Sequence, residues 1–357
     1  MSMLKKIQTV YQLIRRGRSV RGLPLHLQVE ITNACNLRCA TCHRDLLYPR
    51  PTTMKFKYFK KLYDEVRPQN INVSGLGEPF TNQDIFKIIK YAKKNGSAVN
   101  CASNFTLVGD KIEQILDSGI DQIKISVDAV DRETYYRIRH GDFYDTLINN
   151  IKRLNSLKAE TGLQKPILRF NYALQQDNID HLVDAVRLAD KLNIPGIYVQ
   201  YLEYIDREDR KEKLVGNLTY VRLKNTLFEA DKVATKLGIT SNINIWMRDF
   251  DLFMNKMGPE DNFKPNHKKC YFPWFSSWID ADGTVRPCPI IPWQKDVAHM
   301  GNVFNEPFND IWNNTKYQEL RASLARGERP TEPCRTCIPQ SLFNIFHIGT
   351  RMLPGKR

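Results

Sequence analysis

Long apolar runs and secretion signals are missing from this 357-residue sequence. No segment approaches the roughly 20 consecutive apolar residues that a membrane-spanning helix needs. The first 22 residues lack the apolar run and the small-residue cleavage site of a signal peptide. We find no internal repeat and no low-complexity tract. These absences predict a cytoplasmic protein in a reducing compartment, where the eight cysteines are expected to bind metal rather than to form disulfides.

Acidic residues are in deficit, because 39 Asp and Glu face 53 Lys and Arg and leave a net charge of +14. Such a charge favours anionic partners or substrates, although much of the excess stands on helix faces that water can solvate. The first 22 residues combine basic side chains with apolar ones at helical spacing. They predict a basic N-terminal helix that packs on the main domain, with peripheral contact to an anionic membrane surface as the alternative.

Strand and helix patterns alternate from residue 25 to about residue 237. Six strands that are each followed by a helix predict an α/β fold with a parallel sheet and right-handed crossovers. In such folds, ligands bind at the carboxyl ends of the strands. The strands are predicted at 25–31, 71–75, 98–103, 122–128, 167–174 and 197–204, and the main helices at 54–66, 131–160, 179–192 and 217–237.

Three cysteines, Cys35, Cys39 and Cys42, follow the first predicted strand in a CxxxCxxC array. A [4Fe–4S] cube takes four ligands, so three thiolates leave one iron open to a small molecule, whereas structural zinc and iron sites close all four positions. The array therefore indicates catalysis rather than a structural metal. A zinc knuckle that takes His43 or a distant residue as its fourth ligand is the alternative.

This array, between a strand and a helix, resembles the cluster loop of the radical S-adenosylmethionine (SAM) enzymes. Thr41 stands where the family usually has an aromatic residue. The resemblance implies that the open iron chelates the amino and carboxylate groups of SAM and that reductive cleavage releases a 5′-deoxyadenosyl radical. It also implies a partial (β/α)6 barrel of the TIM type and an electron donor such as flavodoxin or ferredoxin.

Residues at later strand ends match the SAM-binding elements of the same family. Gly75, Gly77, Glu78 and Pro79 stand where the family has its GGEP element, which holds the methionine ammonium. An arginine after the fourth strand is expected to grip the methionine carboxylate, and of Arg137 and Arg139 we prefer Arg137. By position, the residues expected along the ribose, the methionine carboxylate and the adenine are Ser103, Asn104, Ser126, Asp128, Asn171, Gln200 and Tyr201. Each of them has a turn, cap or core role as its alternative.

Four more cysteines, Cys270, Cys288, Cys334 and Cys337, match the complete coordination of a second cluster. Between the first two, Asp282-Gly283 predicts a hairpin turn. The region resembles the twitch domain, the short form of the SPASM domain, which implies one auxiliary [4Fe–4S] cluster and two in total. A zinc ribbon is the alternative.

The eighth cysteine, Cys101, lies in the third predicted strand. It is expected to be a small buried hydrophobe, with donation of a hydrogen atom to a substrate radical as the minor alternative.

These patterns predict a basic helix at 1–22, a radical SAM barrel at 23–240, a linker at 241–264, a SPASM/twitch domain at 265–340 and a tail at 341–357. The resemblance to radical SAM enzymes with a twitch domain implies an oxidoreductase that abstracts hydrogen from an unactivated carbon and oxidises or epimerises a polyol, aminocyclitol or sugar. Peptide maturation by crosslinking or epimerisation is the alternative. A basic zinc protein that binds nucleic acid is disfavoured, because the βα layout offers no groove-reading helix. Candidate lining residues of the substrate pocket are Tyr201, Glu203, Tyr204, Trp274, Trp278 and Trp293.

Overall fold

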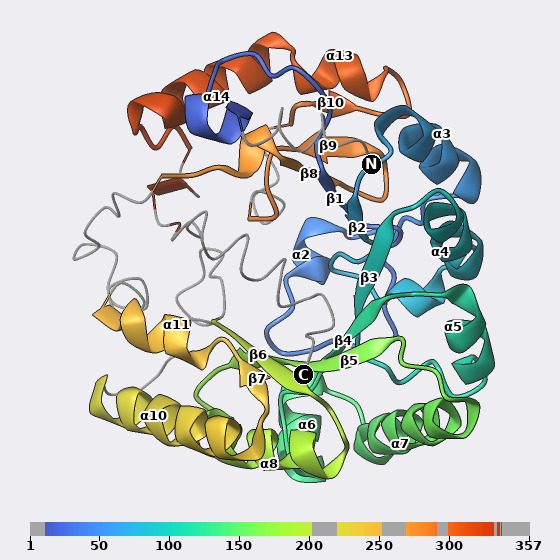
Figure 1. Cartoon of the computed structure of the whole chain (residues 1–357), viewed down its shortest axis with the longest axis vertical. Helices are drawn as coiled ribbons and strands as arrows, with labels where there is room; N and C mark the ends of the chain where they lie inside the picture. Colours follow the sequence, from blue (N-terminus) through green and yellow to red (C-terminus); the bar gives the residue numbers. More distant parts are fainter. Residues whose placement is uncertain are drawn as a thin grey trace.

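The computed structural model describes residues 11–201, 220–251, 269–290, 299–331, 334–335 and 337. Its strands form one sheet in the order β10-β9-β8-β1-β2-β3-β4-β5-β6-β7. Figure 1 shows that this sheet curves and that the helices lie along its outer side. The strands are β1 (His26–Val29), β2 (Asn70–Asn72), β3 (Ala98–Ser103), β4 (Gln122–Ser126), β5 (Ile167–Leu174), β6 (Gly196–Tyr201), β7 (Thr240–Ser241), β8 (Ser276–Ile279), β9 (Thr284–Arg286) and β10 (Gly301–Asn302).

The helices pack on the sheet through apolar stripes with helical spacing. In α3, the buried residues Phe59, Leu62, Tyr63 and Val66 recur at intervals of three or four, which places them on one face of the helix. The helices are α2 (Arg44–Leu47), α3 (Phe56–Val66), α4 (Ile85–Lys94), α5 (Ile112–Ser118), α6 (Arg132–Arg139), α7 (Tyr144–Thr161), α8 (Leu182–Lys191), α10 (Tyr220–Leu237), α11 (Ile243–Arg248), α13 (Phe308–Trp312) and α14 (Thr315–Arg326), with short 3-10 turns η1 (Pro79–Thr81), η2 (Ile179–His181) and η4 (Phe272–Trp274).

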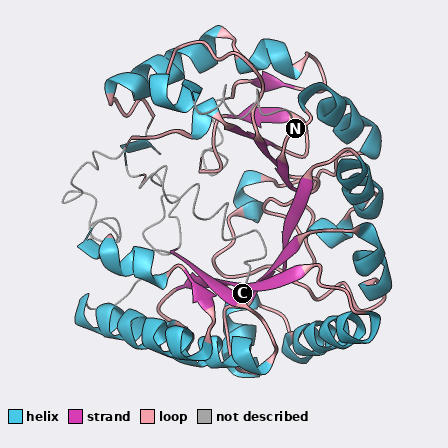
Figure 2. Ribbon diagram, viewed as in Figure 1, coloured by secondary structure: helices cyan, strands magenta, loops and turns pink. Residues whose placement is uncertain are grey.

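Strands β1 to β7 are parallel to their neighbours, as the predicted βα alternation requires. Residues along each strand alternate between the two faces of the sheet. In β1, Leu27 and Val29 are fully buried, whereas His26 and Gln28 line a central cavity. The concave side of β1 therefore carries polar side chains, and the convex face of the sheet lies under the helices, as Figure 2 shows.

The helical region predicted at 131–160 is two helices rather than one. Asp131 begins α6 by accepting a hydrogen bond from the backbone N–H of Thr134 at 2.8 Å. His140 ends α6 in the left-handed conformation, with φ +50°. A left-handed residue cannot continue a right-handed helix, so the chain turns there and α7 begins at Tyr144. The spacing of apolar residues correctly predicted helical structure in this region but did not reveal the break between the two helices.

The C-terminal region extends the barrel sheet. Strand β8 pairs in parallel with β1, and β8, β9 and β10 pair antiparallel in succession. The predicted turn at Asp282-Gly283 joins β8 to β9, with Gly283 at φ +86°. Helices α13 and α14 follow along the chain, each with one buried face. The first barrel strand thus lies between β2 and a strand that is contributed about 250 residues later.

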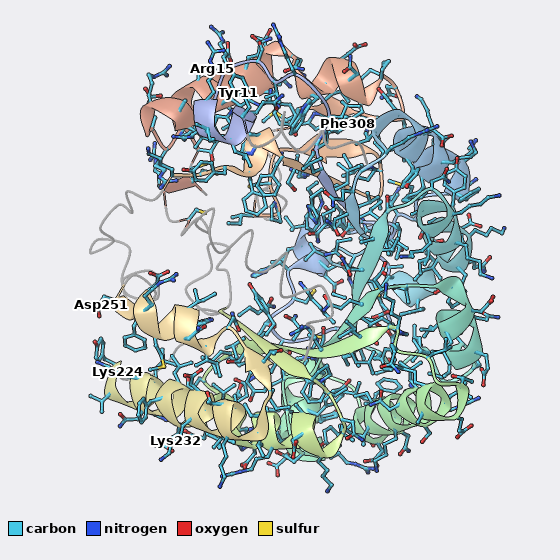
Figure 3. The ribbon with its side chains drawn as sticks, in the orientation of Figure 1. Tyr11, Arg15, Lys224, Lys232, Asp251 and Phe308 are labelled. Atoms are coloured by element: carbon cyan, nitrogen blue, oxygen red, sulfur yellow. The ribbon has the colours of Figure 1, made fainter. Side chains whose placement is uncertain are left out.

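The segment before β1 packs against this C-terminal region. Val20 exchanges two hydrogen bonds of 3.0 Å with the side chain of Asn313, and Trp274 donates its indole N–H to a carbonyl of the segment at 2.8 Å. Figure 3 shows Tyr11 and Arg15 beside α14. Leu13 and Val20 are buried in this contact, whereas Tyr11 and Ile14, two apolar residues of the predicted helix, are exposed. The segment thus packs on the main domain, but not through those two residues, and residues 1–10 lie outside the described part.

The predicted linker at 241–264 contributes to the barrel over its described part. Thr240 and Ser241 form β7, which pairs with β6, and residues 243–248 form α11. The side chain of Asn242 holds both backbone groups of Val199 with hydrogen bonds of 2.7 Å. No helix in the described ranges is long and apolar enough to cross a membrane.

Candidate active site

A single cavity of about 710 Å³ lies on the concave side of the sheet. It brings together the two cysteine sets that the sequence separates by more than 220 residues, and it receives the polar residues of the strands. The cysteines that line it are Cys35, Cys39, Cys42, Cys270, Cys288, Cys334 and Cys337.

The loop after β1 presents Cys35, Cys39 and Cys42 to the cavity. Nitrogen donors point at two of the sulfur atoms, since the N–H of Leu37 lies 3.4 Å from Cys35 Sγ and Arg139 Nη1 lies 3.7 Å from Cys39 Sγ. Such donors stabilise the negative charge of iron-bound thiolates. Burial raises the pKa of the Cys35 thiol to about 11, so deprotonation of this thiol requires a nearby cation such as iron.

The zinc alternative for this loop is not supported. Among the described residues, no three His, Cys, Asp or Glu side chains stand close enough together to hold a single metal ion. A zinc site holds each thiolate about 2.3 Å from one ion, which requires tight convergence. His43 is buried at the start of α2 and does not form a metal-binding group with the cysteines among the described residues. Cys35, Cys39 and Cys42 line the cavity and supply the three thiol donors of the predicted cluster.

Two glycines after β2 allow this region to approach the cysteine loop. A Cβ at Gly77 would lie 2.3 Å from the carbonyl oxygen of Thr32 and 2.6 Å from that of Ala34, and a Cβ at Gly75 would lie 2.3 Å from the side chain of Glu30. Neither position can accept a larger residue without moving the backbone. The glycines of the predicted GGEP element therefore fix the packing of the two loops and also line the cavity.

Glu78 lies in the wall of the cavity and is 2% exposed. Its Oε1 accepts a hydrogen bond from Ser103 Oγ at 2.8 Å, and its Oε2 accepts one from the N–H of Asn104 at 2.6 Å. Burial raises the pKa of Glu78 to about 7, although these donors oppose the shift. Glu78, which follows β2, is therefore hydrogen-bonded to Ser103 and Asn104 at the end of β3. The sequence predicted all three as SAM-binding residues but did not predict these contacts. Pro79, the fourth residue of the element, begins η1 and does not line the cavity.

Arg139, rather than the preferred Arg137, reaches the cavity from α6. Arg139 pairs with Asp128, and both side chains are almost fully buried. Burial alone would lower the pKa of Arg139, but Asp128 and the Cys39 thiol raise it, so the guanidinium stays charged. Its Nε has no hydrogen-bond partner among the described residues and can donate to a ligand. The side chain of Arg137 is 51% exposed and faces Glu133 and Asp177. Each residue of an α-helix is rotated by about 100° from the one before, so side chains two positions apart point in nearly opposite directions. Only one of these two arginines can therefore face the cavity.

The remaining predicted SAM contacts divide between lining and undescribed residues. Ser126, Asn171 and Gln200 line the cavity from β4, β5 and β6. The backbone of Tyr201 ends β6, and its side chain lies outside the described part, as do Glu203, Tyr204 and Trp293. Trp278 lines the cavity, whereas Trp274 packs beneath the N-terminal segment.

The four C-terminal cysteines line the same cavity as the cysteine loop after β1. Cys270 precedes η4, Cys288 follows β9, and Cys334 and Cys337 follow α14. Burial raises the pKa of the Cys270 thiol to about 11, and Thr331 Oγ1 lies 3.0 Å from Cys334 Sγ. Four thiols that line one cavity from three loops offer the number of ligands that a second cluster takes.

Cys101 does not contact the cavity. It is 1% exposed and belongs to the apolar core under the helices, because alternate residues of β3 point to opposite faces of the sheet. The structure therefore does not support the minor alternative, in which Cys101 donates a hydrogen atom to a substrate radical. Burial raises the pKa of its thiol well above the usual value, and Cys101 is a core residue.

Sequence reasoning missed a buried carboxyl group behind the two glycines. Glu30 is fully buried at the end of β1 and accepts a hydrogen bond from the N–H of Leu76 at 2.7 Å. Burial, reinforced by the nearby Asp280, raises the pKa of Glu30 to about 8. A run of alternating polar residues, His26, Gln28 and Glu30, was the available signal that this face of the strand lies inside the barrel.

We expect the stability of the protein to fall between about pH 4.5 and pH 8 because of Glu30. The raised pKa means that the folded state binds the proton more tightly than the unfolded state, so the favourable contribution present at low pH is lost as the pH rises through 8. Glu30→Gln should remove this loss and stabilise the protein by up to about 5 kcal/mol at pH 9. Urea titrations at pH 5 and pH 9 measure the difference, with Glu319→Gln, an exposed carboxylate on α14, as the matched control. An unchanged pH dependence in Glu30→Gln would contradict the assignment.

Comparison with known protein families agrees with this geometry. Residues 29–189 match the radical SAM superfamily, and residues 270–338 match SPASM, an iron–sulfur cluster-binding domain. The chain belongs to the radical SAM superfamily. The predicted fold class is confirmed, and this radical SAM protein carries a SPASM domain where the second cysteine set was found.

Known relatives of this radical SAM protein differ in what they do. It is 26% identical over 316 residues to the AdoMet-dependent heme synthase of Methanosarcina barkeri, covering 85% of this chain and 86% of that one. Among solved structures, it resembles Streptococcus suis SuiB bound to S-adenosylmethionine, with a TM-score of 0.65, 16% identity and coverage of 89% and 72%. Native anSMEcpe bound to AdoMet and the Cp18Cys peptide gives a TM-score of 0.59 at 15% identity, with coverage of 88% and 86%. The two structures support the fold.

Proposed function

We propose that this radical SAM enzyme abstracts hydrogen from an unactivated carbon of a small polar molecule, as a dehydrogenase or an epimerase. The observation that carries the proposal is the convergence of all seven cysteines of the two sets on one cavity. A radical formed beside Cys35, Cys39 and Cys42 would then share this cavity with the substrate and with the second cysteine set.

The seven cysteines of the cavity would hold the two iron–sulfur clusters. Cys35, Cys39 and Cys42 would hold the catalytic [4Fe–4S] cluster, and Cys270, Cys288, Cys334 and Cys337 would hold one auxiliary [4Fe–4S] cluster. When bound, the catalytic cluster and SAM supply a 5′-deoxyadenosyl radical, with electrons from a donor such as flavodoxin or ferredoxin.

SAM has two charged groups at its methionine end that the cavity can recognise. Arg139 carries a positive charge and an N–H without a partner among the described residues, which suits the methionine carboxylate. Glu78 and the glycine loop follow β2, line the same cavity and suit the methionine ammonium. Ser126, Asn171 and Gln200 offer hydrogen-bonding groups for the ribose and the adenine.

The substrate that this cavity supports best is a polyol, an aminocyclitol or a sugar. A volume of about 710 Å³ falls within the usual range for small-molecule sites, about 300–1,000 Å³. Neutral amide and hydroxyl groups such as those of Gln28, Asn72 and Ser74 line it, and they are suited to hydroxyl groups. A peptide substrate is the second candidate, because SuiB and anSMEcpe have been solved with peptides bound.

Anaerobic reconstitution of the full chain tests this proposal. We expect about eight iron and eight sulfide per chain, corresponding to two cubes, and formation of 5′-deoxyadenosine when a reductant and SAM are added. Transfer of deuterium from labelled polyols or sugars into 5′-deoxyadenosine would identify the substrate class, and transfer from labelled peptides would favour the second candidate. A reconstituted protein that contains zinc and does not cleave SAM would refute the proposal.

A further inference from the structure

Lys124 is a cationic side chain in the interior of the barrel that the assigned functions do not use. It lies on β4, two residues before Ser126 and four before Asp128, and it lines the same cavity. At about 3.3 Å per residue along a strand, its Cα lies about 7 Å deeper than that of Ser126 and about 13 Å deeper than that of Asp128. Lys124 therefore stands at the deep end, away from the strand ends where SAM is expected.

Lys124 has no acidic partner among the described residues. Its ammonium lies over the ring of Tyr198, 5.3 Å from the centroid, and that ring also lines the cavity. A cation–π contact is a weak attraction, whereas burial of an unpaired ammonium is strongly unfavourable. The contact with Tyr198 fixes the position of the ammonium but does not offset its burial.

The residues around Lys124 add positive charge and do not neutralise the charge of its ammonium. Arg169 is its register partner on β5, and burial followed by this arginine lowers the pKa of Lys124. His26 also lines the deep end, where burial and then Lys124 lower its pKa to about 4, so His26 is neutral at pH 7. An anion at this point would relieve the desolvation of Lys124 and the repulsion from Arg169 together.

We propose that Lys124 binds an oxyanion of the substrate, a carboxylate or a phosphate, at the deep end of the cavity. The inference rests on the proposed function and narrows its substrate class to polar molecules with one anionic substituent. With that substituent held on Lys124, the opposite end of the molecule would point toward Cys35 and Arg139. Lys124 would thus select the substrate by charge and set which carbon faces the SAM site.

The test uses the anaerobically reconstituted full chain and two probes, inorganic phosphate and succinate, at constant ionic strength. Each probe should raise the melting temperature of the protein if it binds the folded state. Lys124→Met keeps the length of the side chain without its charge. The matched control is Lys57→Met, because Lys57 lies 4.7 Å over the ring of Tyr58 on the exposed side of α3. We expect one probe or both to stabilise the unaltered protein and Lys57→Met, with at least about ten-fold weaker binding to Lys124→Met.

The outcomes distinguish a phosphorylated substrate from a carboxylate. They also test the role of Lys124 independently of the proposed function. Stabilisation by phosphate alone indicates a phosphorylated substrate, and stabilisation by succinate alone indicates a carboxylate. Equal stabilisation of all three proteins, or none of the unaltered protein, would overturn the role of Lys124. Cleavage of SAM by the unaltered protein without substrate tests the proposed function separately, since it does not require the deep end of the cavity.

Discussion

Protein in which Cys35, Cys39 and Cys42 are all changed to alanine is expected to form no 5′-deoxyadenosine from SAM. The three thiols line one side of the cavity, and removal of all of them leaves no protein ligand for a cluster there. The four C-terminal cysteines remain, so the iron content should fall from about eight to about four per chain. Iron analysis and chromatography of the reaction products measure both effects after anaerobic reconstitution.

The control for this variant is Cys101→Ala. Cys101 is buried in the core and does not line the cavity, so its replacement should leave the iron content and SAM cleavage intact, at a modest cost in stability. Undiminished cleavage in the triple variant would disprove the assignment of the catalytic cluster. Loss of all iron from the triple variant would instead show that the C-terminal set cannot hold a cluster by itself.

Replacement of Arg139 by leucine is expected to have the second largest effect. It leaves Asp128 buried without its partner, and breaking a buried ion pair in this way costs about 3–5 kcal/mol. The same change removes the guanidinium proposed to hold the carboxylate of SAM. Urea unfolding measures the first effect, and equilibrium binding of SAM to the reconstituted protein measures the second.

Two further variants separate folding from binding. Arg139→Lys keeps a charge for Asp128 but loses the planar fork, so it should fold and bind SAM at least about ten-fold more weakly. Arg137→Leu, on the exposed side of the same helix, should change stability by less than about 0.5 kcal/mol and leave SAM binding unaltered. If Arg137→Leu weakened SAM binding as much as Arg139→Lys, the original preference for Arg137 would regain support.

The sequence predicted the strands and the two cysteine sets because their signals are local. The runs from Ala98 to Ser103 and from Ile167 to Leu174 were predicted with their observed bounds, since each is a short apolar alternation flanked by turn residues. Cysteine spacing likewise needs no knowledge of tertiary structure. The motif at Gly75 was located for the same reason.

Features that depend on direction or on distant partners were not predictable in this way. The choice between Arg137 and Arg139 depends on the rotation of α6 against β4, which no local pattern specifies. The contribution of Asn242 and α11 to the barrel was missed, because a two-residue strand such as β7 leaves almost no periodicity. Lys124 was overlooked because a lysine in a strand is usually expected to face solvent.

The pairing of β1 with β8 has a consequence for how the chain is synthesised. His26 and Ser276, which are partners in that pairing, are 250 residues apart, so a growing chain displays the outer edge of β1 until its last quarter leaves the ribosome. An unpaired strand edge is a template for aggregation, and contacts between distant residues form slowly. Truncation before residue 276 should therefore yield an aggregating chain rather than an autonomous barrel, and production of the active protein should depend on chaperones that shield nascent polypeptides.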